Sequence, residues 1–367
     1  MARKRVLMLS KALVVGIYQR KLEAIAAHGD IDLLAVVPRS WRDERGELAL
    51  ERVYTSGYRL EVLPLRFNGN YHLHLYDGLG AVMRAFRPDV VHIDEEPYNA
   101  ATWQALIHAR RVGAKTLFFS WQNLLRRYPP PFGWGEQWTL RRVDYALFGT
   151  ESARQVYAEK GYRGPSAVIP QFGTDAALFA PPDAPRPDGP FTIGYFGRLV
   201  AEKGLDDLLA ACARLSGDWR LRLVGGGPLK ATLEAQAAAL GIAARVTFVG
   251  QVASTAMPDE YRRLDAFALP SRTRPNWKEQ FGRVLVEAMA SSVPVIGSDS
   301  GAIPGVIGDG GLVFPEGDVD ALAAHLAALQ ASPEQRAALG ARGRQRVLEH
   351  FTHERIAADT VEVYRSL

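Results

Sequence analysis

The chain alternates short apolar runs with longer segments in which apolar residues recur at positions i, i+3 and i+4. Short uninterrupted apolar runs are typical of parallel strands buried on both faces, and the longer spacing is typical of helices with one apolar face. The alternation predicts repeated β-α-β units. The expected strands are 6–9, 33–37, 90–93, 117–119 and 145–148 in a first series, and 192–196, 221–224, 246–249, 266–269, 295–296 and 312–314 in a second.

Residues 173–190, which separate the two series, are dense in Pro, Asp and Gly and predict a linker. A length of 367 residues is also too great for one compact core. We therefore expect two α/β domains with doubly wound parallel sheets, over residues 1–172 and 191–351. Sheets of this kind bind ligands at the carboxyl ends of their strands, so a cleft between the domains is the expected site. A long helix is expected to begin at Ser332-Pro333, and a last helix follows Thr352.

Composition and charge exclude several classes of protein. The chain is 47% hydrophobic and 23% charged, which excludes disorder as its dominant state, and its one cysteine, Cys212, excludes an intramolecular disulfide and predicts a reducing, cytoplasmic setting. Residues 1–170 carry 24 Lys and Arg against 17 acids, so this half is expected to face an anionic partner, with a solvated basic surface as the alternative. A nucleic-acid partner is not expected, because the excess is modest and no binding motif is present. No apolar run is long enough for a membrane span, so any membrane contact is expected to be peripheral.

The most informative motif runs from Glu279 to Glu287, where two carboxylates stand eight residues apart as the chain enters an apolar helix. If both lay on one helix, they would be roughly 12 Å and roughly 80° apart, and would grip two ends of an elongated ligand. Gly282 would let a ligand approach the backbone, and the N–H groups of a helix start would favour phosphate. Two solvated glutamates on a surface helix are the alternative.

Glycine turns follow the first two strands of the second domain. The first turn contains Gly197-Arg198-Leu199 and Glu202-Lys203-Gly204. In a doubly wound sheet it would lie over the ligand crevice, where Arg198 could fork onto a diphosphate and Lys203 could add a charge; a plain surface loop is the alternative. Gly225 and Gly226 belong to the second turn, which would contact a nucleotide or simply make a tight connection, and it lacks the full dinucleotide fingerprint.

In the first domain, polar residues follow two neighbouring strands. His92 and Glu96 lie at the end of one, where they could bind a sugar hydroxyl or accept a proton, although a histidine there could equally be a structural hydrogen bonder. Trp121, Gln122 and Asn123 end the next, and suit carbohydrate hydroxyls and ring faces or simply cap a loop. The stretch 126–142 mixes arginines with aromatic residues and could dock a lipid headgroup or an acidic acceptor, or pack as an ordinary loop. The Asp-x-Asp pairs at 30–32 and 318–320 are interpreted as caps and turns.

Taken together, these motifs resemble the family 4 retaining glycosyltransferases. The resemblance also includes Phe248-Val249-Gly250, Ala288-Met289-Ala290 and Val293-Pro294-Val295-Ile296, spans nearly the whole chain, and is densest in the second domain. It implies a GT-B architecture, in which two Rossmann-like domains face each other across a cleft. The second domain would hold a nucleotide-diphosphate sugar and the first domain the acceptor, with the C-terminal helix, 352–367, packing back on the first domain.

The resemblance also implies roles for individual residues. Arg198 and Lys203 would bind the diphosphate, Glu279 the donor sugar and Glu287 the ribose hydroxyls, so Glu279, Arg198 and Lys203 are the expected catalytic residues. The implied donor-binding set is Gly197, Arg198, Lys203, Gly225, Gly226, Gln251, Glu279, Phe281, Gly282, Arg283, Val284 and Glu287, and the implied acceptor-binding set is Gly16, His92, Glu96, Trp121, Gln122 and Asn123. In such front-face enzymes the leaving phosphate takes the acceptor proton and the anomeric configuration is kept. No metal or other cofactor is expected, because the cations and a helix start supply the positive charge.

The sequence departs from the family pattern at three places. Residues 10–19 offer only Gly16 where the family usually has a glycine pair, and Gly305 stands where a glutamate commonly follows the Gly-x-x-Pro turn. Gln122 replaces the histidine that many members carry after this strand. Because a neutral amide cannot shuttle protons, Gln122 is expected to bind or orient the sugar.

The expected function is therefore the transfer of a hexose from a UDP- or GDP-sugar to a hydroxyl acceptor, such as a lipid-linked or cell-envelope glycan. Such an enzyme would act in the cytoplasm, with peripheral contact at the inner face of the membrane through its basic first domain. A non-catalytic nucleotide-sugar-binding protein is one alternative, motivated by the missing histidine. A phosphorylase or epimerase on the same two-domain frame is another.

Overall fold

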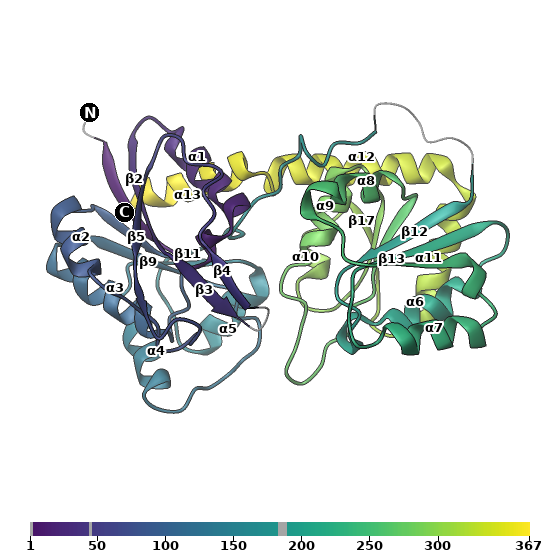
Figure 1. The fold of residues 1–367 in the computed structure, drawn as a ribbon, viewed down its shortest axis with the longest axis horizontal. Coiled ribbons are helices and arrows are strands. Elements are labelled where there is room, and N and C mark those ends of the chain that lie inside the picture. The colour runs from purple at the N-terminus through teal and green to yellow at the C-terminus, as the bar shows by residue number, and fades with distance from the viewer. Residues whose placement is uncertain (1–2, 44–45, 183–188) are drawn as a thin grey trace. The chain divides into compact units, whose positions relative to one another are not determined.

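The computed structural model describes residues 3–43, 46–182 and 189–367 (Figure 1). The chain forms two compact units: unit 1 contains Met1–Gly173 and His353–Leu367, and unit 2 contains Thr174–Thr352. Each unit holds one large sheet with parallel strands, which confirms the predicted fold class. Within the stretch expected to be a linker, Thr174 forms a bridge with Thr352 inside unit 2, and residues 183–188 lie outside the described residues.

The sheet of unit 1 has seven strands in the order β11-β10-β9-β8-β1-β2-β5. Strand order reverses between β1 and β8, which makes the carboxyl ends of these two strands the expected ligand-binding edge of unit 1. The strands are β1 (Lys4–Leu9), β2 (Ile31–Pro38), β5 (Arg59–Leu63), β8 (Val90–Ile93), β9 (Lys115–Ser120), β10 (Tyr145–Phe148) and β11 (Ser166–Val168). Two antiparallel hairpins flank it, β3 (Ser40–Asp43) with β4 (Gly46–Ala49) and β6 (Leu65–Arg66) with β7 (Leu75–Tyr76).

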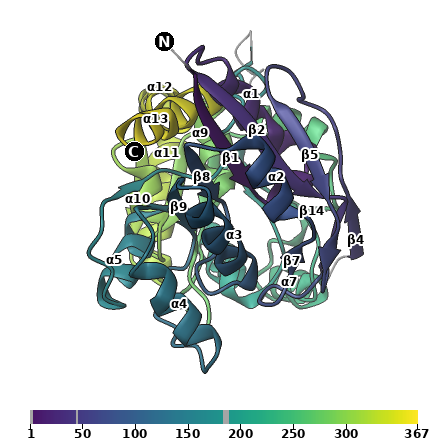
Figure 2. The ribbon, with the colours of Figure 1, turned by 90° about the vertical axis from the view of Figure 1, so that its left-hand side faces the viewer.

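Helices cover both faces of this sheet, which explains why its central strands are almost continuously apolar. The helices are α1 (Arg20–Ala26), α2 (Leu79–Phe86), α3 (Ala100–Arg111), α4 (Phe132–Leu140), α5 (Glu151–Glu159) and α13 (His353–Ser366). Val6 and Met8 of β1 share a buried cluster with residues of α1 and α13, whereas Leu7 and Leu9 share another with residues of α2 and α3. Figure 2 shows α2 and α3 in front of the sheet. The C-terminal helix α13 is thus part of the core of unit 1.

The sheet of unit 2 has six strands in the order β14-β13-β12-β15-β16-β17. They are β12 (Phe191–Phe196), β13 (Trp219–Val224), β14 (Val246–Val249), β15 (Ala266–Leu269), β16 (Val295–Ser298) and β17 (Gly311–Phe314). The order reverses between β12 and β15, so the loops after these two strands form the switch point where sheets of this topology bind ligands.

The helices of unit 2 are α6 (Leu205–Cys212), α7 (Lys230–Ala239), α8 (Met257–Arg262), α9 (Arg283–Ala290), α10 (Ile303–Ile307), α11 (Val319–Ala331) and α12 (Pro333–His350). Helix α6 contacts α7 and α11, and α9 contacts α10 and α12; Figure 1 shows α6 and α7 on the opposite side of the sheet from α9 and α12. Two expected helix starts are confirmed. The side chain of Ser332 accepts a hydrogen bond from the backbone of Gln335 at 3.1 Å, and Asp318 accepts one from Ala321 at 2.9 Å.

Candidate active site

Lys203 and Glu279 meet at the switch point of unit 2. Lys203 ends a short 3-10 turn, Ala201–Lys203, that follows β12, and Glu279 lies in the segment that follows β15. Their charged groups are 2.5 Å apart, with side-chain exposures of 18% and 11%. The hydroxyl of Ser271 donates a second hydrogen bond, of 3.0 Å, to the same carboxylate oxygen of Glu279. A cation and a carboxylate thus face each other at the expected ligand-binding edge.

Backbone-to-backbone packing holds these two loops together. Gly204 has φ +63°, and a Cβ atom there would lie 2.0 Å from the carbonyl oxygen of Pro270. The backbone N–H of Arg272 donates to the carbonyl of Glu202 at 2.8 Å. A side chain at position 204 would push the loops apart, so glycine is required where Lys203 is brought against the end of β15.

Two residues that the sequence analysis did not single out complete this arrangement. The ammonium of Lys203 lies 4.8 Å from the ring centre of Trp277, a distance suited to a cation–π interaction. The guanidinium of Arg272 donates to Asp207, 2.6 Å from Nε, and to Asp206, 3.0 Å from Nη1, both in the first turn of α6. Arg272 therefore anchors the loop that carries Trp277 and Glu279 to the helix that follows Lys203.

The helix α9 begins at Arg283, so Glu279 precedes it and only Glu287 lies on it. The spacing calculated for two carboxylates on one continuous helix therefore does not apply. Gly282, in the left-handed conformation, is the residue that caps the helix; Phe281 precedes the cap, and Arg283 and Val284 begin the first turn. The first turn of a helix has N–H groups without intrahelical partners, which suits a phosphate.

Glu287 is held by a tyrosine from a neighbouring helix. Tyr261 of α8 donates its hydroxyl to a carboxylate oxygen of Glu287 at 2.8 Å, and the same hydroxyl lies 3.2 Å from the carbonyl of Val284. Burial raises the pKa of Glu287, while the hydroxyl of Tyr261 and the charge of Arg283 act in the opposite direction. Tyr261 was not singled out from the sequence.

The other predicted donor-binding residues lie in the turns after β12, β13 and β14. The backbone N–H of Leu199 donates to the carbonyl of Gly226 at 2.9 Å, and a Cβ atom on Gly225 would lie 2.1 Å from the carbonyl oxygen of Gly197. The structure therefore brings the first two turns into contact. Arg198 has an exposed side chain at the first turn, and Gln251, also exposed, follows the end of β14.

In unit 1, the structure brings Glu96 together with the segment after β9. The carboxylate of Glu96 accepts hydrogen bonds from the hydroxyl of Ser120 at 2.5 Å and from the backbone N–H of Trp121 at 2.9 Å. Burial raises the pKa of Glu96 to about 7, against the effect of these hydrogen bonds. The indole N–H of Trp121 donates to Gln171 at 2.7 Å, and the side chains of Gln122 and Asn123 are buried beside it.

His92 and Gly16 are engaged by other residues of unit 1. The ring of His92 is fully buried, and its Nδ1 atom lies 2.7 Å from the hydroxyl of Tyr364 on α13. This burial favours the structural alternative for His92 over a role in acceptor binding. Gly16 is buried, and its backbone N–H donates to the carboxylate of Glu51 at 2.6 Å.

The carboxyl ends of β1 and β8 carry a charged cluster, in which Ser10 and Lys11 contact the acids that follow His92. The hydroxyl of Ser10 donates to Asp94 at 2.6 Å, and Lys11 forms an ion pair with Glu95. Burial alone would raise the pKa of Glu95, but Lys11 and His74 lower it to about 2. Burial raises the pKa of the neighbouring Asp94. The pKa values of these two adjacent carboxyl groups are therefore shifted in opposite directions.

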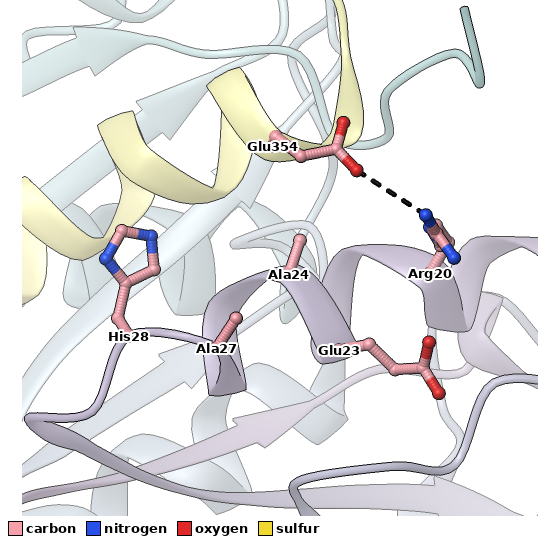
Figure 3. A pocket seen from close by; sticks show the side chains of 6 residues that line it. All are labelled: Arg20, Glu23, Ala24, Ala27, His28 and Glu354. Carbon is pink, nitrogen blue, oxygen red and sulfur yellow. Dashed lines mark ion pairs between the residues drawn. The ribbon is translucent and has the colours of Figure 1, made fainter. Parts of the chain in front are cut away.

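A surface pocket of unit 1 lies between α1 and α13 (Figure 3). Arg20 and Glu354 point toward each other across it, 3.7 Å apart, and the remaining lining residues are Glu23, Ala24, Ala27 and His28. None of the predicted site residues lines this pocket.

Two further observations concern metals and membranes. In the described residues, no group of three or more His, Cys, Asp or Glu side chains is placed to hold a metal ion. No helix in the part of the chain that the structure describes is both long and apolar enough to cross a membrane. The expectation that the reaction needs no metal stays a prediction.

The fold is shared with solved glycosyltransferase structures. The chain matches a glycosyltransferase from Rickettsia africae with a TM-score of 0.75 and 15% identity over 100% of this chain and 99% of that one. It matches a sucrose-phosphate synthase from Thermosynechococcus elongatus with a TM-score of 0.70 and 22% identity over 99% of both chains. The two parallel-sheet units therefore have the GT-B fold of these structures.

Sequence comparison identifies the family. Residues 179–346 match the model of glycosyl transferases group 1, and residues 17–171 match the glycosyl transferase 4-like domain. A GDP-mannose-dependent alpha-(1-6)-phosphatidylinositol monomannoside mannosyltransferase from Mycolicibacterium smegmatis is 34% identical over 69% of this chain and 72% of its own length. A lipopolysaccharide core biosynthesis mannosyltransferase from Rhizobium meliloti is 33% identical over 64% of this chain and 69% of its own length. The chain belongs to the group 1, family 4 glycosyltransferases and is a glycosyltransferase enzyme.

Proposed function

We propose that this protein is a retaining hexosyltransferase that transfers a sugar from a nucleotide diphosphate to a hydroxyl acceptor. Unit 2 binds the donor and unit 1 binds the acceptor. The observation that carries the proposal is the contact of Lys203 with Glu279 at the switch point of unit 2. Cations bind diphosphate oxygens and carboxylates accept hydrogen bonds from sugar hydroxyls, and this contact places one group of each kind side by side.

The donor that we propose first is GDP-mannose. Two relatives that are at least 33% identical to this chain are mannosyltransferases, and the name of one states that it depends on GDP-mannose. A UDP-sugar is the second candidate donor, because the sequence motifs do not distinguish UDP-sugars from GDP-sugars. Glu287, held by Tyr261, is the proposed partner of the ribose hydroxyls in either donor.

The proposed mechanism uses the charge of unit 2 to stabilise the leaving diphosphate. Lys203, Arg198 and the start of α9 bind its oxygens as negative charge develops on them. The leaving phosphate oxygen accepts the proton of the acceptor hydroxyl, on the same face of the sugar at which the acceptor attacks. The C1–O bond to phosphate breaks, a new C1–O bond to the acceptor forms, and the anomeric configuration is kept.

The proposed acceptor is a lipid-linked or cell-envelope glycan at a membrane surface. Support comes from the exposed part of the segment 121–143, in which Leu125 is 49% exposed and Trp134 is 72% exposed. The exposed charged residues of this segment are all arginines, at positions 126, 127, 141 and 142. Arginines beside exposed apolar side chains suit the headgroup region of an anionic leaflet, so we propose peripheral contact at the cytoplasmic face.

Transfer assays with defined donors test the proposal. The purified full-length protein is incubated with GDP-mannose, UDP-glucose or UDP-galactose and a lipid extract, and nucleotide release and glycolipid formation are followed. We expect sugar transfer from one donor, and we expect NMR of the product to show that the anomeric configuration is retained. In the Glu279→Ala variant we expect the transfer rate to fall on the order of 10²-fold. Transfer by Glu279→Ala at the wild-type rate would overturn the assigned role, and inversion of configuration would overturn the proposed mechanism.

A further inference from the structure

Gln122, which stands where many family members have a histidine, makes three side-chain hydrogen bonds within unit 1. Its side-chain oxygen accepts hydrogen bonds from the ammonium of Lys160 at 2.7 Å and from the hydroxyl of Tyr157 at 3.0 Å. Its amide nitrogen donates to the hydroxyl of Tyr128 at 3.3 Å. These partners come from α5, the residue after it, and the segment before α4.

Lys160 belongs to a buried ion pair. Its ammonium lies 2.6 Å from the carboxylate of Glu136 on α4, and the two side chains are only 4% and 5% exposed. The same ammonium lies 5.2 Å from the ring centre of Tyr128 and 5.0 Å from that of Tyr157. Burial lowers the pKa of Lys160, whereas Glu136 raises it.

A buried ion pair adds little to stability compared with apolar residues of the same size, because both charges must leave water. The stability of unit 1 therefore does not by itself explain the pair of Lys160 with Glu136. Its geometric effect is on Gln122. An ammonium only donates hydrogen bonds, so the amide oxygen of Gln122 must face Lys160 and the amide nitrogen must face away from it.

The orientation of the amide decides what Gln122 can offer a ligand. Both hydrogen bonds to its oxygen come from unit 1 itself. The nitrogen carries two N–H groups, of which the hydrogen bond to Tyr128 uses one. The group that Gln122 presents to a ligand is therefore an N–H donor.

We propose that Lys160, held by Glu136, is a positioning residue that fixes Gln122 as an obligate hydrogen-bond donor to a substrate oxygen. The oxygen is a hydroxyl oxygen of the acceptor that unit 1 is proposed to bind, so this inference rests on the proposed function. A histidine can donate or accept at this place, whereas this arrangement restricts the site to donation. The Lys160–Glu136 pair acts on the reaction only through the amide.

Substitutions at Gln122 test whether catalysis depends on the hydrogen-bond donor of its side chain or only on its volume. In Gln122→Glu the carboxylate can still accept from Lys160 and Tyr157 but donates nothing. We expect kcat/KM of Gln122→Glu to fall roughly tenfold or more, as far as that of Gln122→Ala, which corresponds to one lost hydrogen bond of about 1.4 kcal/mol. Wild-type kcat/KM in Gln122→Glu would overturn the proposal.

A double-mutant cycle separates a positioning role of Lys160 from a structural one. Lys160→Met is combined with Glu136→Leu, so that no buried charge is left unpaired, and the pair of substitutions is made with and without Gln122→Ala. We expect the ion-pair variant to lose kcat/KM when Gln122 is present and to lose nothing further when Gln122 is already alanine. Losses that add fully would overturn the proposal, because Lys160 would then act independently of the amide.

Two controls keep the outcome unambiguous. Binding of GDP or UDP, measured by calorimetry, reports on unit 2 and is expected to be unchanged in all these variants, and the thermal unfolding midpoint identifies any variant that has lost its fold. Lys160→Arg, which keeps a cation that only donates, is expected to retain more activity than Lys160→Met. If the wild-type protein transfers no sugar from any nucleotide donor, the proposed function itself fails. If it transfers sugar and the cycle is additive, only this inference fails.

Discussion

The ammonium of Lys203 lies 2.5 Å from the carboxylate of Glu279, although 76 residues separate them in the chain. Each group neutralises the other in the absence of a ligand. In the proposed function, the negative charge of a bound diphosphate would compete with Glu279 for the ammonium, and the carboxylate would become available to a sugar hydroxyl. The contact would then link recognition of the phosphate to recognition of the sugar.

Removal of the ammonium is expected to affect both catalysis and nucleotide binding. Lys203→Met takes away the cation and leaves the carboxylate of Glu279 facing the diphosphate, so we expect kcat/KM to fall on the order of 10²-fold or more. Nucleotide affinity, measured by calorimetry, is expected to fall as well. Arg220→Met is the matched control, since Arg220 also carries one positive charge but lies near the amino end of β13. Equal effects of the two substitutions would contradict the role of Lys203.

The hydroxyl of Tyr261 is expected to set the pH range in which Glu287 binds the ribose. Burial raises the pKa of Glu287, and the hydrogen bond from Tyr261 opposes that rise. A carboxyl with a raised pKa is ionised only above that pKa, so its ability to accept from ribose hydroxyls is present at higher pH and is lost as the pH falls. In Tyr261→Phe the pKa rises further, and the loss of nucleotide affinity is expected to begin at a higher pH than in the wild-type protein.

Dissociation constants for GDP or UDP measured across the pH range 5–8 check this expectation. Tyr162→Phe is the control, because Tyr162 is a buried tyrosine of unit 1 that donates to the carbonyl of Pro165. Superimposable pH profiles for Tyr261→Phe and the wild-type protein would show that Tyr261 does not act on Glu287.

Much of the fold could be predicted because its central strands are buried on both faces. The bounds of β8 and β15 agree fully with the apolar runs seen in the sequence. Strand β5 was missed because it lies at the edge of the sheet, pairs only with β2, and alternates exposed and half-buried residues. Strand β11, at the other edge, was also not predicted, because it has only three residues and none of them is fully buried.

Candidate site residues could be named from the sequence only where they belong to a recognisable motif. Glu279, Glu287 and Lys203 stand in the motifs that carry the resemblance to the family, whereas Tyr261 and Lys160 stand outside those motifs. Tyr261 reaches Glu287 from 26 residues away, and Lys160 reaches Gln122 from 38 residues away. Such contacts arise when the fold brings together helices and loops that are distant in the sequence, and no local pattern in the sequence records them.

Sugar transfer is expected to continue without divalent metal. The positive charge that a metal would supply to the leaving diphosphate is instead supplied by Lys203, Arg198 and the start of α9 in the proposed mechanism. We expect kcat/KM in excess EDTA to stay within about twofold of the untreated protein. A large loss that added Mg²⁺ or Mn²⁺ restores would contradict a metal-independent mechanism.

The carboxyl of Glu96 is expected to make the stability of unit 1 depend on pH. Burial raises its pKa from 4.5 to about 7, so the folded state binds a proton more tightly than the unfolded state. This contribution to stability is fully present below about pH 4.5 and is lost as the pH rises through 7, with a slope of up to about 1.4 kcal/mol per pH unit between the two values.

Denaturant unfolding of Glu96→Gln at pH 5, 6, 7 and 8 measures that contribution. The free energy of unfolding of the wild-type protein, relative to Glu96→Gln, is expected to fall between pH 5 and 7 and then to level off. Glu151→Gln, which changes an exposed carboxyl of α5, is the control. A constant difference between the wild-type protein and Glu96→Gln over the whole range would contradict the raised pKa.

The turn after β13 is expected to need glycine at position 225 for packing rather than for contact with a nucleotide. Gly225 has φ +130°, and a Cβ atom there would lie 2.1 Å from the carbonyl oxygen of Gly197, whereas a Cβ atom on Gly226 would meet nothing within 4 Å. Gly225→Ala is therefore expected to destabilise the folded protein by about 1–3 kcal/mol, and Gly226→Ala to leave the unfolding midpoint nearly unchanged. Urea unfolding of both variants, without nucleotide, makes the comparison. Equal midpoints for the two variants would show that the turn can relax away from Gly197, and that the contact between the two glycine turns does not fix the backbone there.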